Sequence, residues 1–316
     1  MSQSIPVIDL HSSNHSDLVK AIADACRDFG FFGVINHDID PLIISEAFIQ
    51  SRSFFALDDI QKQALHIKNS PCNRGFDPIG WQSLDLSKEG DASAADLKES
   101  FYVGTEKQID ASNDVPNHGE NQWPSESSLP GFALAVNNYK EEAMNLSCRL
   151  IRLIAQSLHM APDALDSLML YPTCTTRLLY YPPQPSAQSN QIGSGAHTDW
   201  GAVTVLAQDD LGGLEVRLIN GDWISVTPQK GMLVINTGDL MQRWTNDTYL
   251  SAWHRVINKH EDKARYSIAH FFDMDHFAEI KTLPSCISSS NPEKYPVIRA
   301  GDHIVEMYRR TTLEQK

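Results

Sequence analysis

The chain has 316 residues, of which 41% are apolar and 21% are charged. This composition is typical of a globular protein and excludes a chain that is disordered throughout. Acidic residues outnumber basic ones by 40 to 26, which gives a formal net charge of −14. Because such a field repels nucleic-acid phosphates and anionic lipid, we expect neither as a partner. One buried arginine could still bind an anionic small molecule.

The sequence carries no sign of a membrane or secreted protein. No run approaches about 20 consecutive apolar residues, and the start lacks the basic end and the apolar run of a signal peptide. Five cysteines lie far apart and form no CxxC motif: Cys26, Cys72, Cys148, Cys174 and Cys286. We therefore expect unpaired thiols in a reducing cytoplasm and no membrane partner. The sequence leaves the oligomeric state open.

The first half of the chain is predicted to be mainly helical. Residues 17–29 carry an amphipathic apolar stripe that ends at Gly30, and the short apolar run 31–35 is of strand type. Further helices are expected over residues 41–57, 58–65 and 139–158, of which the last has the clearest pattern. Two polar stretches, 84–96 and 105–128, are predicted to be surface loops.

After about Thr173 the pattern changes to short β-runs separated by turn residues. These runs are 177–181, 202–207, 214–219, 223–226, 232–236, 252–257 and 265–272, and Asn220-Gly221 between two of them is a strong hairpin signal. Many short strands at this spacing indicate a sandwich or barrel, with jelly rolls among the candidates. We predict a mainly helical region, 1–172, that packs on the core without folding independently, and a β domain with a C-terminal extension, 173–316.

A His-x-Asp tripeptide occurs three times in the chain, so context must choose among the copies. His15 and Asp17 lie where a helix begins, and Asp17 there is best explained as a cap or first-turn carboxylate. The copy at residues 260–262 lies in a charged segment typical of a solvated turn. His197 and Asp199 instead lead directly into an apolar strand. On extended backbone both would project to one face, where they can bind one ion together.

His254 lies in a later β-run and can supply a third ligand from a neighbouring strand. Two imidazoles and one carboxylate on one side of a metal leave the opposite positions open, an arrangement typical of non-haem Fe(II) oxygenases. A zinc hydrolase would also suit this set, but it normally needs a carboxylate base or another water activator beside the metal. The sequence contains no HExxH motif.

Arg265 and Ser267 open the β-run that follows His254 by eleven residues, and strand alternation places them on one face. A guanidinium forms a bidentate pair with a carboxylate, and a hydroxyl adds a further donor. An Arg-x-Ser is more often structural when it stands alone. Downstream of the three candidate ligands, it predicts a carboxylate-binding site.

Over nearly its whole length the chain resembles the iron(II)- and 2-oxoglutarate-dependent dioxygenases of the isopenicillin N synthase-like superfamily. Matching fragments in the family's order include Ile5-Pro-Val-Ile-Asp9, Asp96-Leu-Lys-Glu-Ser-Phe101, Ala196-His-Thr-Asp-Trp-Gly201, Asn236-Thr-Gly-Asp239, His254-Arg-Val256 and Arg265-Tyr-Ser267. The resemblance implies a mainly β fold with flanking α-helices, built on a double-stranded β-helix or jelly-roll core.

The same resemblance implies the chemistry of the site. Iron would be held by His197, Asp199 and His254, and Arg265 and Ser267 would pair with the C5 carboxylate of 2-oxoglutarate. The 2-oxo acid end of that co-substrate would chelate the metal, and O₂ would take the last position. The hydroxyl at the position of Tyr181 commonly reaches the co-substrate, although a tyrosine packed under the sheet is the alternative.

The sequence gives less support for residues that contact the substrate than for residues that bind the metal and the co-substrate. Arg177 shares the face of Tyr181, so it points inward if Tyr181 does, where it could hold an anionic group or form a salt bridge at the barrel rim. Phe271 shares the face of Arg265 and could contact substrate or only pack in the core. Tyr102 and Arg74 are weaker candidates.

We therefore predict an oxidoreductase that uses Fe(II), 2-oxoglutarate and O₂ to oxidise a small organic molecule, most simply by hydroxylation, with formation of succinate and CO₂. The first alternative is an isopenicillin N synthase-type oxidase that uses no 2-oxoglutarate and grips the substrate's own carboxylate with Arg-x-Ser. The second is a ligand-binding or sensory protein that keeps the metal site without turnover.

Overall fold

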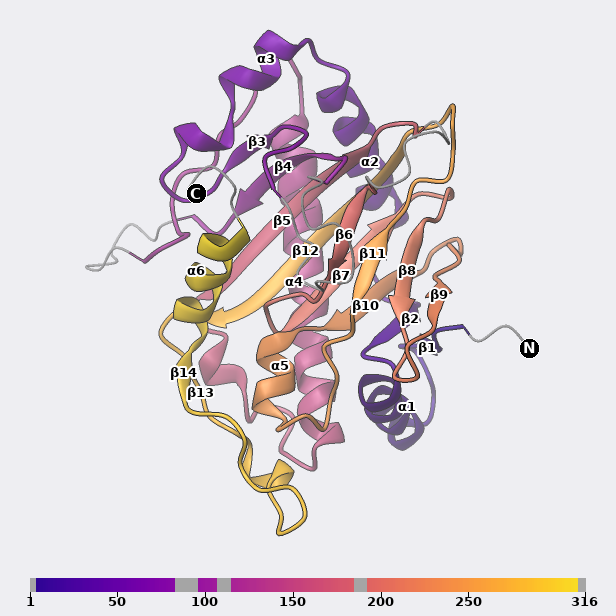
Figure 1. Ribbon diagram of the computed structural model, residues 1–316, viewed down its shortest axis with the longest axis vertical. Helices are drawn as coiled ribbons and strands as arrows, with labels where there is room; N and C mark the ends of the chain where they lie inside the picture. The colour runs from indigo at the N-terminus through magenta and orange to yellow at the C-terminus, as the bar shows by residue number, and fades with distance from the viewer. Residues whose placement is uncertain (1–3, 83–95, 107–114, 185–191, 312–316) are drawn as a thin grey trace.

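The architecture comes from a computed structural model that describes residues 4–82, 96–106, 115–184 and 192–311 (Figure 1). Almost all of the predicted loop 84–96 and residues 107–114 of the second predicted loop lie outside the described residues. Within the described part of the chain, no helix is long and apolar enough to cross a lipid bilayer.

A large mixed sheet runs through the centre of the molecule, and its strands come from both halves of the chain. Among the described residues it has eight strands, in the order β1-β2-β10-β7-β12-β5-β4-β3. In that order the strands are Val7–Asp9, Phe31–Ile35, Leu233–Thr237, Val203–Gln208, Arg265–Asp275, Pro172–Tyr181, Glu99–Gly104 and Gly75–Asp77. Only β1 and β2 pair in parallel within this set. The region 1–172 thus adds β1, β2, β3 and β4 to the sheet. That this region does not fold independently of the β domain stays a prediction.

A smaller sheet lies against one face of the large one (Figure 1). Its described strands follow the order β6-β11-β8-β9, which are Ser194–His197, His254–Val256, Leu214–Arg217 and Trp223–Ser225. Apolar side chains from both sheets, among them Phe31, Leu179, Val216, Val234 and Ala269, form one buried cluster. Two sheets that enclose a shared interior confirm the expected jelly-roll core.

Helices cover the opposite face of the large sheet. These are α1 (His15–Asp28), α2 (Pro41–Phe55), α3 (Asp59–Ala64) and α4 (Phe132–Ser157), with α5 (Asp239–Trp244) and α6 (Ala300–Thr311) near the strands β13 (Glu279–Ile280) and β14 (Ile298–Arg299). Figure 1 shows α4 directly behind the strands. The side chain of Asn14 caps α1 by accepting the amide of Asp17, which lies in the first turn as predicted.

The long helix α4 starts seven residues before its predicted beginning at residue 139. Phe132 and Val136 extend the buried stripe of Tyr139 and Ala143 at helical spacing, so the first two turns pack on the same core. Gly131 precedes them at a φ of 75°, a left-handed conformation that glycine adopts without strain. Tertiary packing therefore sets the start of this helix.

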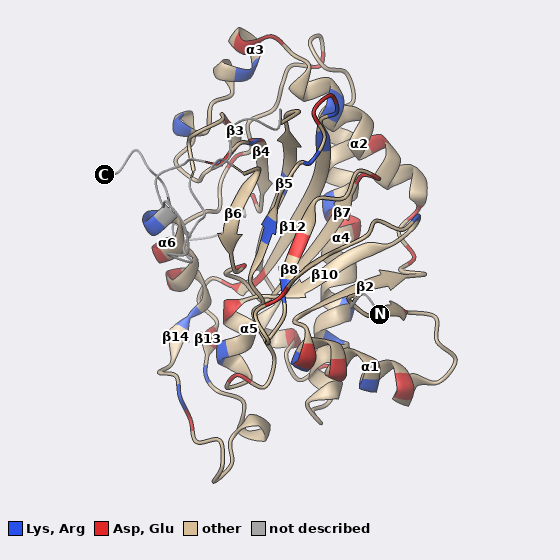
Figure 2. Ribbon diagram, turned by 45° about the vertical axis from the view of Figure 1, so that its right-hand side comes forward, with Lys and Arg blue, Asp and Glu red and all other residues tan. Residues whose placement is uncertain are grey.

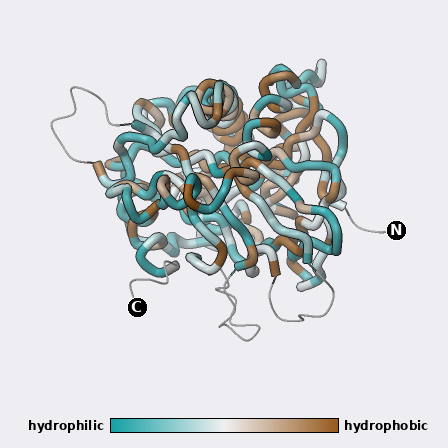
Figure 3. The backbone as a smooth tube through the Cα atoms, turned by 90° about the horizontal axis from the view of Figure 1, so that it is seen from above, coloured by the Kyte–Doolittle hydropathy of each residue, from teal (hydrophilic) through white to brown (hydrophobic). Residues whose placement is uncertain are grey.

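Charge and hydropathy follow this layering. Figure 2 shows most acidic and basic residues on the outer helices and the connecting loops. Figure 3 shows hydrophilic stretches along much of the periphery, with hydrophobic stretches toward the interior. Charged side chains that are buried between the two sheets therefore need a separate explanation, because burying an unpaired charge is costly.

Candidate active site

His197 and His254 meet because their strands are neighbours. His197 ends β6 and His254 begins β11, and the two residues are directly opposite one another in this antiparallel pair. Their imidazole centroids are 4.2 Å apart. Asp199 follows β6, and its Oδ1 lies 3.6 Å from Nε2 of His254 and 4.0 Å from Nε2 of His197. One ligand atom from each residue lies within 4.8 Å of the other two, so a single ion could contact all three.

Each histidine is held by a carbonyl of its own segment. Nδ1 of His197 lies 2.7 Å from the oxygen of Gly195, and Nδ1 of His254 lies 3.2 Å from the oxygen of Ala252. When Nδ1–H donates to a carbonyl, the lone pair of Nε2 is free to bind a metal. Burial, together with the neighbouring His254, lowers the pKa of His197 to about 3, which keeps its imidazole neutral at physiological pH.

The carboxylate of Asp199 is oriented by two neighbours. Its Oδ2 accepts hydrogen bonds from Oγ1 of Thr204 at 2.5 Å and from Nδ2 of Asn236 at 2.7 Å. Burial alone would raise the pKa of Asp199, but His254, His197 and these two donors together hold it below its usual value. The group is therefore ionised, and its Oδ1 is directed toward the two Nε2 atoms. This donor set fits a divalent metal of the Fe(II) class.

Arg265 and Ser267 lie side by side on the inner face of β12. Nη1 of Arg265 donates to Oγ of Ser267 at 3.1 Å, and its Nε donates to the carbonyl of Gly212 at 2.5 Å. The guanidinium carbon lies 4.9 Å from the centroid of the Tyr181 ring. Arg265 and Ser267 are each about 1% exposed, so a carboxylate bound there would be shielded from water.

A cavity joins these groups to the three candidate ligands. Its wall includes His197, Asp199, His254, Arg265, Ser267 and Tyr181. The structure therefore brings together all six residues that the sequence predicted for the metal and co-substrate. A carboxylate at Arg265 and a chelating group at Asp199 belong to one continuous space.

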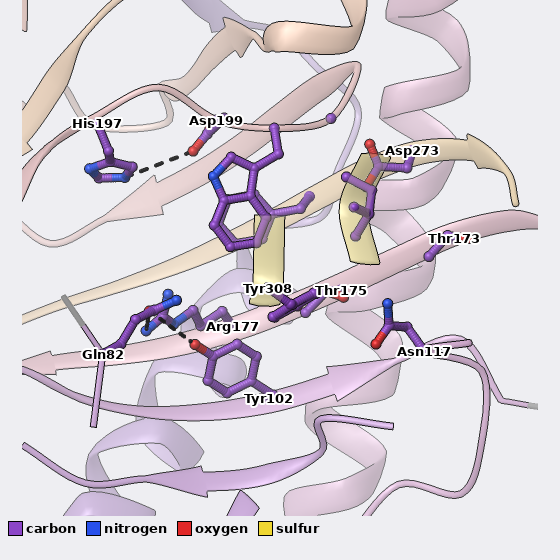
Figure 4. Close-up of a pocket in the computed structure, with 14 residues that line it drawn as sticks. Gln82, Tyr102, Asn117, Thr173, Thr175, Arg177, His197, Asp199, Asp273 and Tyr308 are labelled. Carbon is purple, nitrogen blue, oxygen red and sulfur yellow. Dashed lines mark hydrogen bonds and ion pairs between the residues drawn. The ribbon is translucent and has the colours of Figure 1, made fainter. Parts of the chain in front are cut away.

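A second cavity lies on the other side of the candidate ligands (Figure 4). His197, Asp199, Arg177 and Phe271 line both spaces. The predicted residue Tyr102 lines the second one, as do Gln82, Asn117, Thr173, Thr175, Trp200, Asp273, Ile304 and Tyr308, for which we had no prediction. Except for Asp273, which shares the inner face of β12 with Arg265, nothing local in the sequence marks this second group, because its members come from distant segments.

Arg177 points inward and is already paired. Its Nη2 donates to Asp77 at 3.2 Å, to Gln82 at 3.0 Å and to Ser100 at 2.9 Å. The ring of Tyr102 lies 4.5 Å from the guanidinium carbon, and its hydroxyl donates to the same carboxylate. Of the two alternatives for Arg177, the structure shows the salt bridge, in a buried position. Arg177 also lines both cavities, and its contact with an anionic group stays a prediction.

Arg74 occupies a different environment. Its guanidinium is fully buried and donates to backbone carbonyls of Cys72, Asn73, Thr105 and Asn117. Among the described residues it is not part of either cavity wall. Its contacts tie three segments together, and a direct substrate contact at Arg74 has no support from this geometry.

Asp96 and Lys98 form an ion pair, and Lys98 lines the site. The sequence did not predict a role for either residue. Both side chains are almost completely buried, and Lys98 is part of the wall of the cavity that also contains Arg265. Oδ1 of Asp96 accepts the amide of Gly195 at 2.9 Å, while the carbonyl of Gly195 holds His197. The family-like fragment at 96–101 was the available signal, but it carried no role by itself.

Known proteins match this chain in sequence and in fold. Residues 5–126 match the family model described as non-haem dioxygenase in morphine synthesis N-terminal, and residues 172–274 match the 2OG-Fe(II) oxygenase superfamily. The 2-oxoglutarate-dependent dioxygenase citB of Monascus ruber is 35% identical over 326 residues, which cover 98% of this chain and 94% of that protein. The 2-oxoglutarate-Fe(II) type oxidoreductase hxnY of Emericella nidulans is 33% identical over 303 residues, or 93% and 84% of the two chains.

A crystal structure of a full-length Neurospora crassa protein in complex with alpha-KG and thymine has the same fold, with a TM-score of 0.85 and 31% sequence identity. The match covers 97% of this chain and 96% of that one.

Proposed function

The chain belongs to the 2OG-Fe(II) oxygenase superfamily, and we propose that His197, Asp199 and His254 are the ligands of its iron. It is a 2-oxoglutarate-dependent dioxygenase, an oxidoreductase that uses Fe(II), 2-oxoglutarate and O₂ to oxidise a small organic substrate. The observation that carries the ligand assignment is the convergence of three buried ligand atoms within 4.8 Å. The orientation of both imidazoles and of the carboxylate supports it further, since hydrogen bonds leave the inward atoms free.

Arg265 and Ser267 bind the C5 carboxylate of 2-oxoglutarate in this proposal. The guanidinium and hydroxyl already lie in hydrogen-bond contact and share a cavity with the candidate ligands. Tyr181 packs against the guanidinium, with its ring facing the same cavity. The opposite, 2-oxo acid end of the co-substrate then faces Asp199 and the two histidines. Because Arg265 is buried, its pairing with a carboxylate is stronger than it would be in water.

The bound iron and co-substrate supply the oxidising chemistry, in which 2-oxoglutarate becomes succinate and CO₂. The contribution of this chain is positioning and shielding. His197 and Asp199 line both cavities, so a substrate in the second cavity lies beside the metal ligands. The buried walls keep bulk water from the reacting atoms.

We further propose that Phe271, Arg177 and Tyr102 contact the substrate in the second cavity, and that the oxidation is a hydroxylation. All three side chains line that space, and Phe271 stands at its border with the co-substrate cavity. The related Neurospora crassa structure carries thymine, a small ring compound, together with alpha-KG. A small organic molecule of comparable size is therefore the expected substrate.

The test is the stoichiometry of the reaction. Purified enzyme with Fe(II) and 2-oxoglutarate is supplied with fractionated small molecules from the source organism, and succinate and oxidised product are quantified together. We expect one succinate per oxidised molecule. Product formation without 2-oxoglutarate would instead indicate an oxidase that grips its substrate with Arg265.

The location of the enzyme is also a proposal. All five cysteines are free thiols, four of them buried. This supports the expectation of a reducing cytoplasm, where thiols stay unpaired. Fluorescence microscopy of the tagged protein in its own host would test it, and a signal confined to a secretory compartment would contradict it.

A further inference from the structure

Asp273 is a buried carboxyl group on the wall of the substrate cavity. Strand alternation on β12 carries the inner face from Arg265 past Phe271 to Asp273, so one strand lines both cavities. The residue is 6% exposed. Figure 4 shows Asp273 and Thr173 on the opposite side of the pocket from His197. A ligand group bound to Asp273 would therefore determine how far the rest of that ligand extends toward the proposed metal ligands.

Only one oxygen of Asp273 has a hydrogen-bond partner in the described part of the chain. Oδ1 accepts the amide of Ala202 at 3.1 Å. Gly201 makes this contact possible, because a Cβ there would lie 1.9 Å from Oδ1. Burial raises the pKa of Asp273 to about 7. The other oxygen, Oδ2, is therefore left to accept a hydrogen bond from a ligand that supplies a donor.

Several other polar groups on this wall already have protein partners. Oγ1 of Thr173 lies 2.9 Å from Nε2 of His118. Oε1 of Gln82 accepts a hydrogen bond from Arg177 at 3.0 Å. The amide oxygen of Asn117 accepts one from another side chain at 2.9 Å. Among these groups, Asp273 retains the acceptor that faces the cavity.

The same wall also carries apolar and aromatic side chains. Trp200 and Phe271 contribute aromatic rings, and Ile304 and Tyr308 project from α6. The rings of Trp200 and Tyr308 meet edge to face, with centroids 5.1 Å apart and planes at 81°. Such walls suit a planar ring whose edges carry few polar groups.

We propose that Asp273 determines substrate specificity by accepting a hydrogen bond from an N–H or O–H group on a flat, largely apolar ring compound. The inference rests on the proposed function, because it places the ring in the cavity beside His197 and Asp199. It adds the chemical class of the substrate: a ring that carries a donor, such as a lactam, an azole N–H or a phenol.

The variant Asp273→Asn tests directly whether Asp273 acts as a hydrogen-bond acceptor. The amide of Ala202 needs an acceptor, so the side-chain oxygen of the variant should take the place of Oδ1. Its NH₂ group then faces the cavity in place of Oδ2, so a hydrogen-bond donor replaces the hydrogen-bond acceptor of the wild-type protein. The preference among ligands should therefore reverse, an outcome that general destabilisation would not produce.

The experiment measures binding by calorimetry to the anaerobic enzyme loaded with Fe(II) and 2-oxoglutarate, at about pH 8.5, where Asp273 is ionised. The probe compounds are indole, which carries an N–H donor, benzofuran, the same ring without that donor, and quinoline, which presents a nitrogen acceptor. Thr173→Val is the matched control, since it removes a polar group from the same wall.

In the wild-type enzyme and in Thr173→Val, indole should bind about tenfold or more tightly than benzofuran and quinoline. In Asp273→Asn, quinoline should bind about threefold or more tightly than indole, with the affinity for 2-oxoglutarate unchanged. If indole does not bind the wild-type enzyme, or shows no advantage there, the proposal is wrong. An unchanged preference in Asp273→Asn also overturns it. Failure of the wild-type enzyme to bind 2-oxoglutarate would instead contradict the proposed function.

Discussion

The two cavities that meet at His197 and Asp199 are built in different ways. The co-substrate cavity takes its polar groups from alternate positions on paired strands, as Arg265 opposite Tyr181 illustrates. The substrate cavity draws on distant segments, including the loop with Trp200 and the C-terminal helix with Tyr308. The paired strands thus position the side chains proposed to bind the metal and the co-substrate. The loop with Trp200 and helix α6 position side chains that a substrate would contact.

The largest expected effect tests the proposed metal site between the two cavities. Asp199→Ala removes the buried carboxylate that both histidines face, so iron should be lost and activity should fall about a thousandfold or more. The fold should remain, because the side chain serves the site more than the core. Metal analysis and circular dichroism check both points.

The exposed Asp262, from another His-x-Asp tripeptide, provides the control. Asp262→Ala should keep iron and activity. Full iron content in Asp199→Ala would show that the cavities do not meet at a metal.

The second prediction distinguishes ligand binding in one cavity from ligand binding in the other. Arg265→Ala should raise the dissociation constant of 2-oxoglutarate about a hundredfold, because removing one partner of a buried charge pair costs about 2–5 kcal/mol. Binding of indole to the substrate cavity should change far less. Calorimetry with each compound measures the two effects, and Arg152→Ala, which breaks an exposed ion pair on α4, is the control. An unchanged affinity for 2-oxoglutarate would exclude Arg265 from its assigned role.

A smaller effect is expected from the group that orients the carboxylate. Asn236→Ala removes the 2.7 Å hydrogen bond to Oδ2 of Asp199, and iron affinity should fall about 10–100-fold. Competition with a chelator measures this affinity. The exposed Asn220, in the turn between β8 and β9, is the matched position, and Asn220→Ala should leave the affinity unchanged. Equal affinities in the two variants would mean that Asp199 needs no support from β10.

The smallest effect concerns the face of β12 turned away from both cavities. Burial, with a further contribution from Lys140, lowers the pKa of His270 to about 3. An unfolded histidine titrates near pH 6.5, so below that pH the unfolded state binds the extra proton and the folded state loses stability. The stability is fully present above about pH 6.5 and falls by up to about 1.4 kcal/mol per pH unit toward the folded pKa.

His270→Gln should make the free energy of unfolding less dependent on pH, by the equivalent of up to about one bound proton. The affinity for 2-oxoglutarate should stay the same. Urea unfolding at about pH 7, 6 and 5 measures the slope for both proteins. Identical slopes would contradict the assignment to His270.

The sequence predicted the strand-borne part of the site and missed most of the rest, for a physical reason. His197, Asp199, Arg265 and Ser267 could be predicted because alternation along extended backbone determines which side chains share a face, and His254 because it lies in a later β-run. The family resemblance pointed to Tyr181, and alternation then placed Arg177 on the same face. Asp273 continues the face of Arg265, so this signal was present in the sequence and was not used.

Trp200, Ile304 and Tyr308 carried no such signal. Their place in the cavity depends on how the loop after β6 and the helix α6 pack, and that packing involves residues far apart in the chain. Arg74, a candidate substrate contact, lies outside both cavity walls for a similar reason, because carbonyls from three segments hold its guanidinium. Family resemblance supplied the jelly-roll core, which strand patterns alone left among several β architectures.

An anaerobic crystal structure with Fe(II) and 2-oxoglutarate, using anomalous scattering to locate the metal, tests the central claim most directly. We predict one iron bonded to Nε2 of His197, Nε2 of His254 and Oδ1 of Asp199. The C5 carboxylate of 2-oxoglutarate should lie on Arg265 and Ser267, with its 2-oxo acid end at the metal. Iron at another position, or a co-substrate carboxylate away from Arg265, would contradict the account.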